Sequence, residues 1–171
     1  HEGHHHESDP HIWLSPENAK IMAQNICQGL SRQYPRWETV FKDNLQGLLA
    51  RLEALEQYGQ ETLQTLSCRE LLTFHDGFSY FAQAFDLHIL AALEEESGSE
   101  ASAKELIGLI RLARAHALPA VFVEKNGSAS AADILCRETG AKKATLDMAM
   151  AGESYFDAMY HNIDTIKEAL G

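Results

Sequence analysis

The fold is decided by the stretch Leu71-Leu72-Thr73-Phe74-His75-Asp76-Gly77, in which a short apolar run ends in a histidine, an acid and a glycine. Such a run predicts a short buried strand. Three similar runs follow at 88–92, 120–123 and 143–146, and helical patterns separate them. Strands that alternate with helices predict an α/β fold, with a four-stranded parallel sheet and helices on both of its faces.

The expected helices have recognisable starts and stops. Within the sheet region they cover 78–85, the segment opened by the capping box Ser102-Ala103-Lys104-Glu105, 128–139 before Gly140, and 155–170. Ahead of the sheet, Ser15-Pro16 begins a helix over 16–34. Leucines at helical spacing then predict one long helix over 35–66, which Gly47 and Gly59 could kink.

The composition narrows the class of ligand. The chain has 171 residues, with 14 Lys+Arg against 25 Asp+Glu and a net charge of −11. This excess of negative charge argues against nucleic acid or an anionic membrane surface as partner, and it is compatible with a cationic ligand. No apolar run is long enough to span a membrane.

Two features at the level of the whole chain stay open. The cysteines Cys27, Cys68 and Cys136 form no C-x-x-C pair, and the sequence does not decide whether Cys68 and Cys136 are bridged. The chain also opens without a start methionine or a signal-like apolar run. We therefore expect further sequence before residue 1 in the natural protein.

Candidate ligand-binding residues follow the strands, because the carboxyl ends of parallel strands meet at one edge of a sheet. The residues at these ends are His75 with Asp76, Glu94–Glu96, Glu124 and Asp147. No glycine-rich phosphate loop or Gly-x-Ser-x-Gly elbow follows a strand, which argues against a nucleotide site and a serine hydrolase. Elsewhere, Pro10 fixes the backbone before His11.

Imidazole nitrogens with one carboxylate suit zinc. Two histidines and one aspartate, His11, His75 and Asp147, would supply three ligands. The fourth position would then be open, as in a zinc enzyme, or filled by a residue outside this sequence, as in a transport or storage site. Asp147 could equally be an ordinary turn cap, and Glu94–Glu96 a solvated loop.

The other titratable residues receive lesser roles. Asp76 and Glu124 could orient a ligand from outside the coordination sphere, although Asp76 could also simply cap a helix. A cluster of histidines lies at the start of the chain and consists of His1, His4, His5 and His6. It predicts an accessory loop that gathers metal ions. The remaining histidines lie inside strand or helix patterns and are expected to be structural: His88, His116 and His161.

Two segments resemble motifs of a known family, the zinc and manganese solute-binding proteins of ABC transporters. They are Asp9-Pro10-His11-Ile12-Trp13-Leu14-Ser15-Pro16 and Phe74-His75-Asp76-Gly77-Phe78-Ser79-Tyr80-Phe81, with Ser102–Leu106 and Val121–Glu124 continuing in register. The resemblance covers the whole chain but only the C-terminal part of the family's usual length. It implies two α/β lobes joined by a long helix: 1–34 would end the first lobe, 35–66 would link, and 67–171 would form the C-terminal lobe.

The resemblance also implies a metal site between the lobes, with four side chains as ligands. His11 would be the second ligand, His75 the third and Asp147 the fourth, and the first would come from the absent part of the first lobe. A histidine in the third place resembles the zinc binders, whereas a glutamate there resembles the manganese binders. The family's aspartate is often followed by proline, but here Met148 follows it.

In function, the resemblance implies a protein that captures Zn²⁺ outside the cytoplasmic membrane and delivers it to an ABC-transporter permease. It would be periplasmic, or anchored to the membrane as a lipoprotein, and it would not be an enzyme. Two rivals are a zinc-dependent hydrolase that uses the same ligands with an open position, and an adhesion module for which the metal is incidental. Because the helix over 16–34 would expose Ile21, Ile26 and Leu30 without its first lobe, we also expect self-association.

Overall fold

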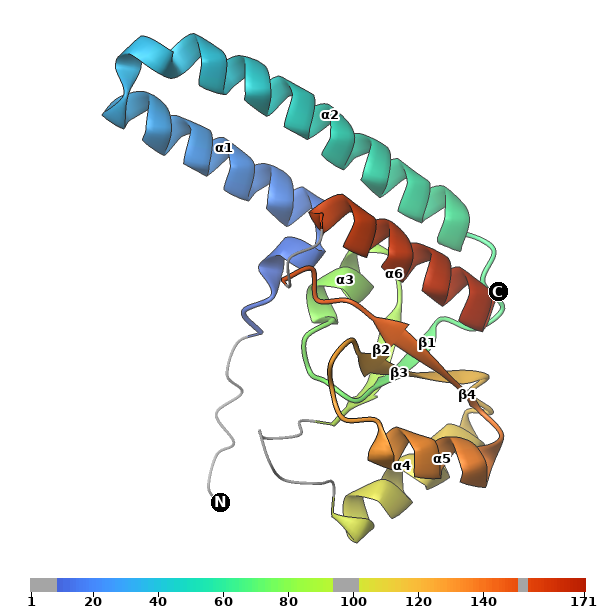
Figure 1. The fold of residues 1–171 in the computed structure, drawn as a ribbon. Helices are drawn as coiled ribbons and strands as arrows, with labels where there is room; N and C mark the ends of the chain where they lie inside the picture. Colours follow the sequence, from blue (N-terminus) through green and yellow to red (C-terminus); the bar gives the residue numbers. More distant parts are fainter. Residues whose placement is uncertain (1–8, 94–101, 151–153) are drawn as a thin grey trace, which may run out of the picture.

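The structure is a computed structural model, and it describes residues 9–93, 102–150 and 154–171. A long helical hairpin leads into an α/β unit, whose sheet lies between two layers of helices (Figure 1). Within the described residues, no helix is both long and apolar enough to cross a membrane.

The sheet has four strands in the order β2-β1-β3-β4, and every neighbouring pair is parallel. The strands are β1 (Glu70–Thr73), β2 (His88–Ala92), β3 (Ala120–Glu124) and β4 (Lys142–Leu146). The predicted four-stranded parallel sheet is therefore confirmed. Its order matters for the site, because β3 lies between the two strands that precede His75 and Asp147.

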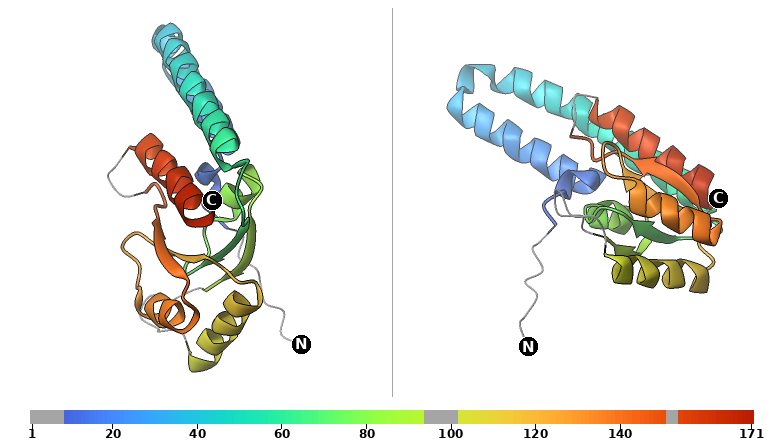
Figure 2. Two further views of the ribbon diagram at one scale, coloured as in Figure 1. Left: turned by 90° about the vertical axis from the view of Figure 1, so that its right-hand side faces the viewer. Right: turned by 60° about the horizontal axis from the view of Figure 1, so that its bottom comes forward.

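Successive residues of the strands face opposite sides of the sheet and divide the apolar core in two. Phe122 packs with helices α2 (Glu38–Leu63) and α6 (Tyr155–Leu170) on one face. Its neighbours Val121 and Val123 pack with α4 (Ala103–Ala115) and α5 (Ser130–Thr139) on the other. Figure 2 shows the two layers from the side. Continuous apolar strands are what a sheet covered on both faces requires.

The expected helix signals are found at their positions. Ser102 and Glu105 form the predicted capping box of α4, and Gly140 ends α5 in the left-handed conformation with φ of 80°. The short helix α3 (Ser79–Ala84) follows the His75 loop. Ser15 caps α1 (Pro16–Gln33), its hydroxyl accepting a hydrogen bond from the N–H of Asn18.

The long helix is shorter than predicted. Residues 35–37 form a separate 3₁₀ turn, and α2 runs only from Glu38 to Leu63. It continues through Gly47 and Gly59 without interruption, so neither glycine breaks the helix. Gly59 serves packing instead, since a Cβ there would lie 2.7 Å from Cζ of Phe85.

Ion pairs join α1 to α2 in the hairpin, and an apolar groove lies between the two helices. The Lys20 ammonium lies 2.6 Å from the carboxylates of both Glu53 and Glu56 on α2. Beside this contact, the two helices border a groove of about 450 Å³ whose walls are mostly apolar. Ile26 and Leu30 line it and are 59% and 38% exposed.

The three cysteines are free thiols. A bridge between Cys68 and Cys136, which the sequence left open, is therefore not formed. Cys68 and Cys136 instead pack against the core between the sheet and the α4–α5 layer.

Candidate metal centre

His11 is held by the aspartate two residues before it. Oδ1 of Asp9 accepts hydrogen bonds from the backbone N–H of His11, at 2.9 Å, and from its ring Nδ1, at 2.7 Å. A carboxylate can only accept, so the proton of the neutral ring belongs on Nδ1. Nε2 then carries the lone pair that a metal ion needs.

Asp9 also joins the two histidine-bearing segments. Its second oxygen, Oδ2, accepts a hydrogen bond from the hydroxyl of Ser79, the first residue of α3. Partial burial raises the pKa of Asp9, but the hydrogen bonds from Ser79 and His11 outweigh it and hold that pKa below its usual value. Asp9 is therefore ionised near neutral pH and can fix the orientation of the His11 ring.

His75 lies at the end of β1, beside His11. The ring centroids of His11 and His75 are 5.4 Å apart, with an angle of 71° between the planes. Two imidazoles that bind one tetrahedral zinc ion through nitrogen at about 2.0–2.1 Å place their centroids roughly 5 Å apart. The spacing of this pair therefore fits a shared zinc ion.

Gly77 permits this close approach of the two rings. A Cβ at this position would lie 2.8 Å from Cδ2 of His75 and 2.9 Å from Nδ1 of His11. It would also meet the side chain of Met148, at 2.6 Å from Cε. Any side chain at residue 77 would thus push the two imidazoles and the loop after β4 apart.

Glu124 lies beside the His75 ring. Its Oε2 is 3.5 Å from Nδ1 of the His75 ring. A carboxylate beside Nδ1 favours the tautomer with its lone pair on Nε2, as in many metal-binding histidines. The orienting role of Glu124 stays a prediction, and this contact is compatible with it.

Asp147 is fixed at the end of β4 by hydrogen bonds to its backbone groups. The side-chain amide of Asn162 bonds both the N–H and the carbonyl of Asp147, each at 2.7 Å. Asn162 is fully buried and Asp147 is only 7% exposed. The Asp147 carboxylate accepts the N–H of Ala149 on Oδ1 at 2.8 Å and the Lys125 ammonium on Oδ2 at 3.3 Å.

Trp13 connects the His11 segment to the loop that carries Asp147. Its indole N–H donates to the carbonyl of Met148 at 2.8 Å, and its own carbonyl accepts from the Tyr155 hydroxyl at 2.7 Å. Burial raises the pKa of Tyr155, which keeps that hydroxyl protonated as a donor. Segments more than 130 residues apart in sequence are therefore tied together at the site.

The three predicted ligands do not form a closed site. In the part of the chain that the structure describes, no three His, Cys, Asp or Glu side chains are arranged to hold a metal ion. His11 and His75 are adjacent, whereas Asp147 is paired with Lys125. Asp76 is exposed, and no hydrogen bond joins it to the described residues. His1, His4, His5, His6 and Glu94–Glu96 lie outside the described residues.

The histidines expected to be structural lie apart from this pair. His88 is exposed at the start of β2. His116 ends α4 with its Nδ1 3.0 Å from a carboxylate oxygen of Glu70. Nε2 of His161 is 3.0 Å from the carbonyl oxygen of Thr145.

Several residues at the site were not assigned a role from the sequence, among them Asp9, Trp13, Lys125 and Asn162. Asp9 had a local signal, since the side chain of an aspartate often accepts a hydrogen bond from the backbone N–H two residues later. Trp13, Lys125 and Asn162 contact residues far away in sequence, and their residue types alone carry no sign of those contacts.

Comparison with known proteins identifies similar chains. The family model described as "Zinc-uptake complex component A periplasmic" (ZnuA) matches residues 1–169. The zinc-binding lipoprotein AdcA of Streptococcus pneumoniae is 31% identical over 98% of this chain, which spans 35% of that relative. A putative metal-binding protein of Treponema pallidum is 33% identical over 99% of this chain, which spans 54% of it.

Solved structures agree in fold. A crystal structure of ZnuA superimposes with a TM-score of 0.87 at 34% identity, covering 96% of this chain and 61% of that one. A zinc-bound ZnuA deletion mutant gives a TM-score of 0.86 at 33% identity, covering 99% of this chain and 64% of that one. This chain therefore spans between about a third and two thirds of the proteins to which it is similar.

Proposed function

Because this chain belongs to the ZnuA family of zinc-uptake components, we propose that it is part of a solute-binding protein that captures Zn²⁺ for an ABC transporter. The observation that carries this proposal is the pair of adjacent imidazoles, His11 and His75. Both have a carboxylate beside Nδ1, from Asp9 and Glu124. This donor set suits zinc better than manganese, which prefers oxygen ligands.

In this proposal His11, His75 and Asp147 are the zinc ligands of this chain. Residues 1–34 end a first lobe that supplies the remaining ligand, 35–66 link the lobes, and 67–171 form the C-terminal lobe. The histidines at 1, 4, 5 and 6 gather zinc near the site. Asp147 joins the two imidazoles when zinc arrives, since its carboxylate is held at the same edge of the sheet.

The protein would act outside the cytoplasmic membrane, in the periplasm or as an anchored lipoprotein, and pass zinc to a membrane permease. One similar protein is named a zinc-binding lipoprotein, and that name supports the second arrangement. The capture and release of an ion make and break no covalent bond, so the proposed protein is not an enzyme.

Metal titration tests the proposal. Calorimetry should be done on a variant with alanine at positions 1, 4, 5 and 6, so that the N-terminal histidines do not contribute. We expect one Zn²⁺ per chain, and Mn²⁺ affinity at least roughly 100-fold weaker because the site offers two imidazoles. Equal affinity for the two ions would contradict a zinc site. Zinc-dependent ester or peptide hydrolysis that His75→Ala abolishes would favour the hydrolase instead.

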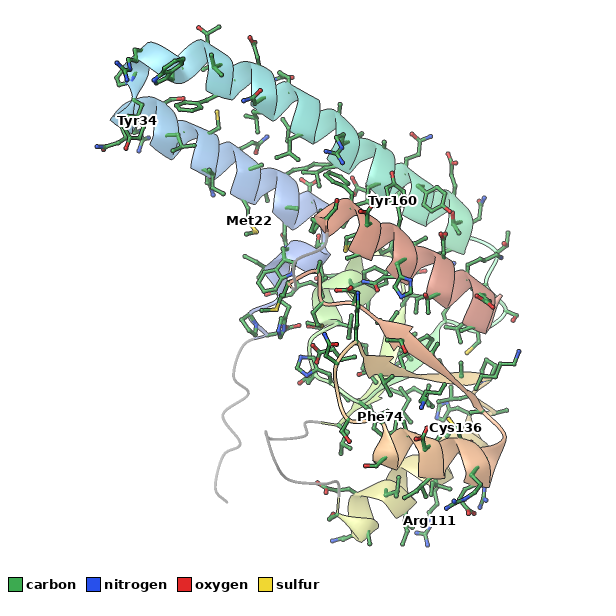
Figure 3. The ribbon with its side chains drawn as sticks, viewed as in Figure 1. Met22, Tyr34, Phe74, Arg111, Cys136 and Tyr160 are labelled. Atoms are coloured by element: carbon green, nitrogen blue, oxygen red, sulfur yellow. The ribbon has the colours of Figure 1, made fainter. Side chains whose placement is uncertain are left out.

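We further propose that this chain associates with a second copy through the groove between α1 and α2. The apolar side chains that line it include Ile26 and Leu30, which are 59% and 38% exposed, and Ile21 elsewhere on α1 is 46% exposed. Figure 3 labels Tyr34 at the end of this hairpin, where it is 50% exposed. Apolar surface of this extent favours burial against another apolar surface.

Light scattering tests the association. The 171-residue chain should form dimers or larger species as its concentration rises. Ile26→Glu should shift it toward the monomer, because a carboxylate in the groove would lose its hydration on association. Ile107→Glu is the matched control, since Ile107 is 50% exposed on α4 and does not line the groove. A wild-type chain that stays monomeric at high concentration would contradict the proposal.

A further inference from the structure

The end of β3 lies between the two strands that precede predicted zinc ligands, and it carries two charged residues in succession. Glu124 is 3.5 Å from His75, which follows β1. Lys125 is 3.3 Å from Asp147, which follows β4. Each thus faces one predicted ligand and bears the charge opposite to the ligand's ionised form. Glu124 can remain in place when zinc binds, but Lys125 cannot.

The difference lies in the oxygen that Lys125 contacts. Oδ1 of Asp147 accepts the backbone N–H of Ala149, whose loop is held by Trp13 and Asn162. That hydrogen bond belongs to a fixed loop. Oδ2 is contacted by an ammonium on a long, flexible side chain that is 40% exposed. Oδ2 is therefore the oxygen that can exchange its partner.

Lys125 and zinc then require the same carboxylate oxygen. An ammonium 3.3 Å from Oδ2 would lie beside a divalent cation bound to that oxygen, and like charges at such distances repel strongly away from bulk water. Asp147 is nearly buried, so solvent screens this repulsion only in part. The lysine side chain can reach solvent by rotation about its own bonds.

We propose that Lys125 is a competing cation at the zinc site. It neutralises Asp147 when zinc is absent, moves away when zinc binds, and returns when zinc leaves. This inference rests on the proposed function, because it takes Asp147 as a zinc ligand. Its consequence is that Lys125 lowers the affinity for zinc and assists release of the ion.

Replacement of Lys125 tests the sign of this effect. Lys125→Met keeps most of the side-chain length and removes the charge, and Zn²⁺ calorimetry should show binding roughly five- to twentyfold tighter than in the wild type. Lys143→Met is the control, because Lys143 forms an ion pair with Asp133 away from the site, and it should bind within about twofold of the wild type. Unchanged or weaker binding by Lys125→Met would overturn the inference.

A second measurement follows the lysine itself in the wild-type chain. Acetylation by acetic anhydride, read residue by residue by mass spectrometry, should be several-fold faster at Lys125 with saturating Zn²⁺ than without it. Lys143 should react equally in both states. Equal reactivity of Lys125 in both states would also overturn the inference. If zinc binds through His11 and His75 but these tests fail, only the role of Lys125 is lost; if zinc does not bind there, the proposed function fails with it.

Discussion

Replacement of both His11 and His75 by alanine should lower the affinity for Zn²⁺ by at least roughly 100-fold, since only one of the three ligands proposed in this chain would remain. The two rings are adjacent, with centroids 5.4 Å apart. Beside their contact with each other, the rings are held by Asp9 and Glu124 at the edge of the sheet, outside the apolar core. The fold should therefore survive the replacement, and the loss should appear in binding.

Calorimetry of the chain without its N-terminal histidines measures this effect. The matched control replaces His88 and His116, which removes the same number of imidazoles from positions away from the pair. The control should bind zinc within about threefold of the parent, because neither ring contacts the proposed site. A double variant of His11 and His75 that binds within tenfold of the parent would exclude these residues as the principal ligands.

Replacement of Asn162 by leucine should lower the free energy of unfolding by about 2–4 kcal/mol. Leucine has the same branched shape at Cγ, but it cannot satisfy the backbone N–H and carbonyl of Asp147, which both bond the Asn162 amide at 2.7 Å. Asn162 is fully buried, so water cannot replace either hydrogen bond without a change in packing. Urea denaturation measures the loss.

The same variant should also bind zinc roughly tenfold or more weakly at temperatures where it is folded, because the Asp147 loop would no longer be fixed. Glu168→Leu is the control on the same helix, since Glu168 is exposed, and its unfolding free energy should stay within about 0.5 kcal/mol of the wild type. An Asn162→Leu chain with wild-type stability and wild-type zinc affinity would show that the amide does not hold the loop.

Much of the fold could be predicted because its signals are local. Val121, Phe122 and Val123 are buried on both faces of a sheet, and a short apolar run indicates such a strand by itself. Ser102 with Glu105, and Gly140, mark helix ends through contacts within a few residues. The exact limits of α2 were missed, because residues 35–37 form a separate 3₁₀ turn and the helix ends at Leu63 instead of at residue 66.

The candidate site divides in the same way. Its position at the carboxyl edge of the sheet followed from the strand pattern, and His75 and Asp147 could be chosen because each ends a strand. The nearness of His11 to His75 could not be derived from that pattern, since they lie 64 positions apart in the chain. The two histidines could be grouped only by the donor chemistry that suits zinc and by the resemblance to a family.

By itself, the sequence determined the class of fold, the order of its elements and the chemistry of its candidate ligands, because residue type and short-range spacing encode these directly. Only the tertiary structure decided which partners those ligands have: Asp9 for His11, Glu124 for His75, and Lys125 with Asn162 for Asp147. Asp9 and His11 are close in the chain, but the other contacts depend on the strand order β2-β1-β3-β4 and on the packing of α6, which bring together residues that are distant in the chain. The type of a charged or amide side chain indicates which groups it can bind, whereas the fold determines which of them lie within reach.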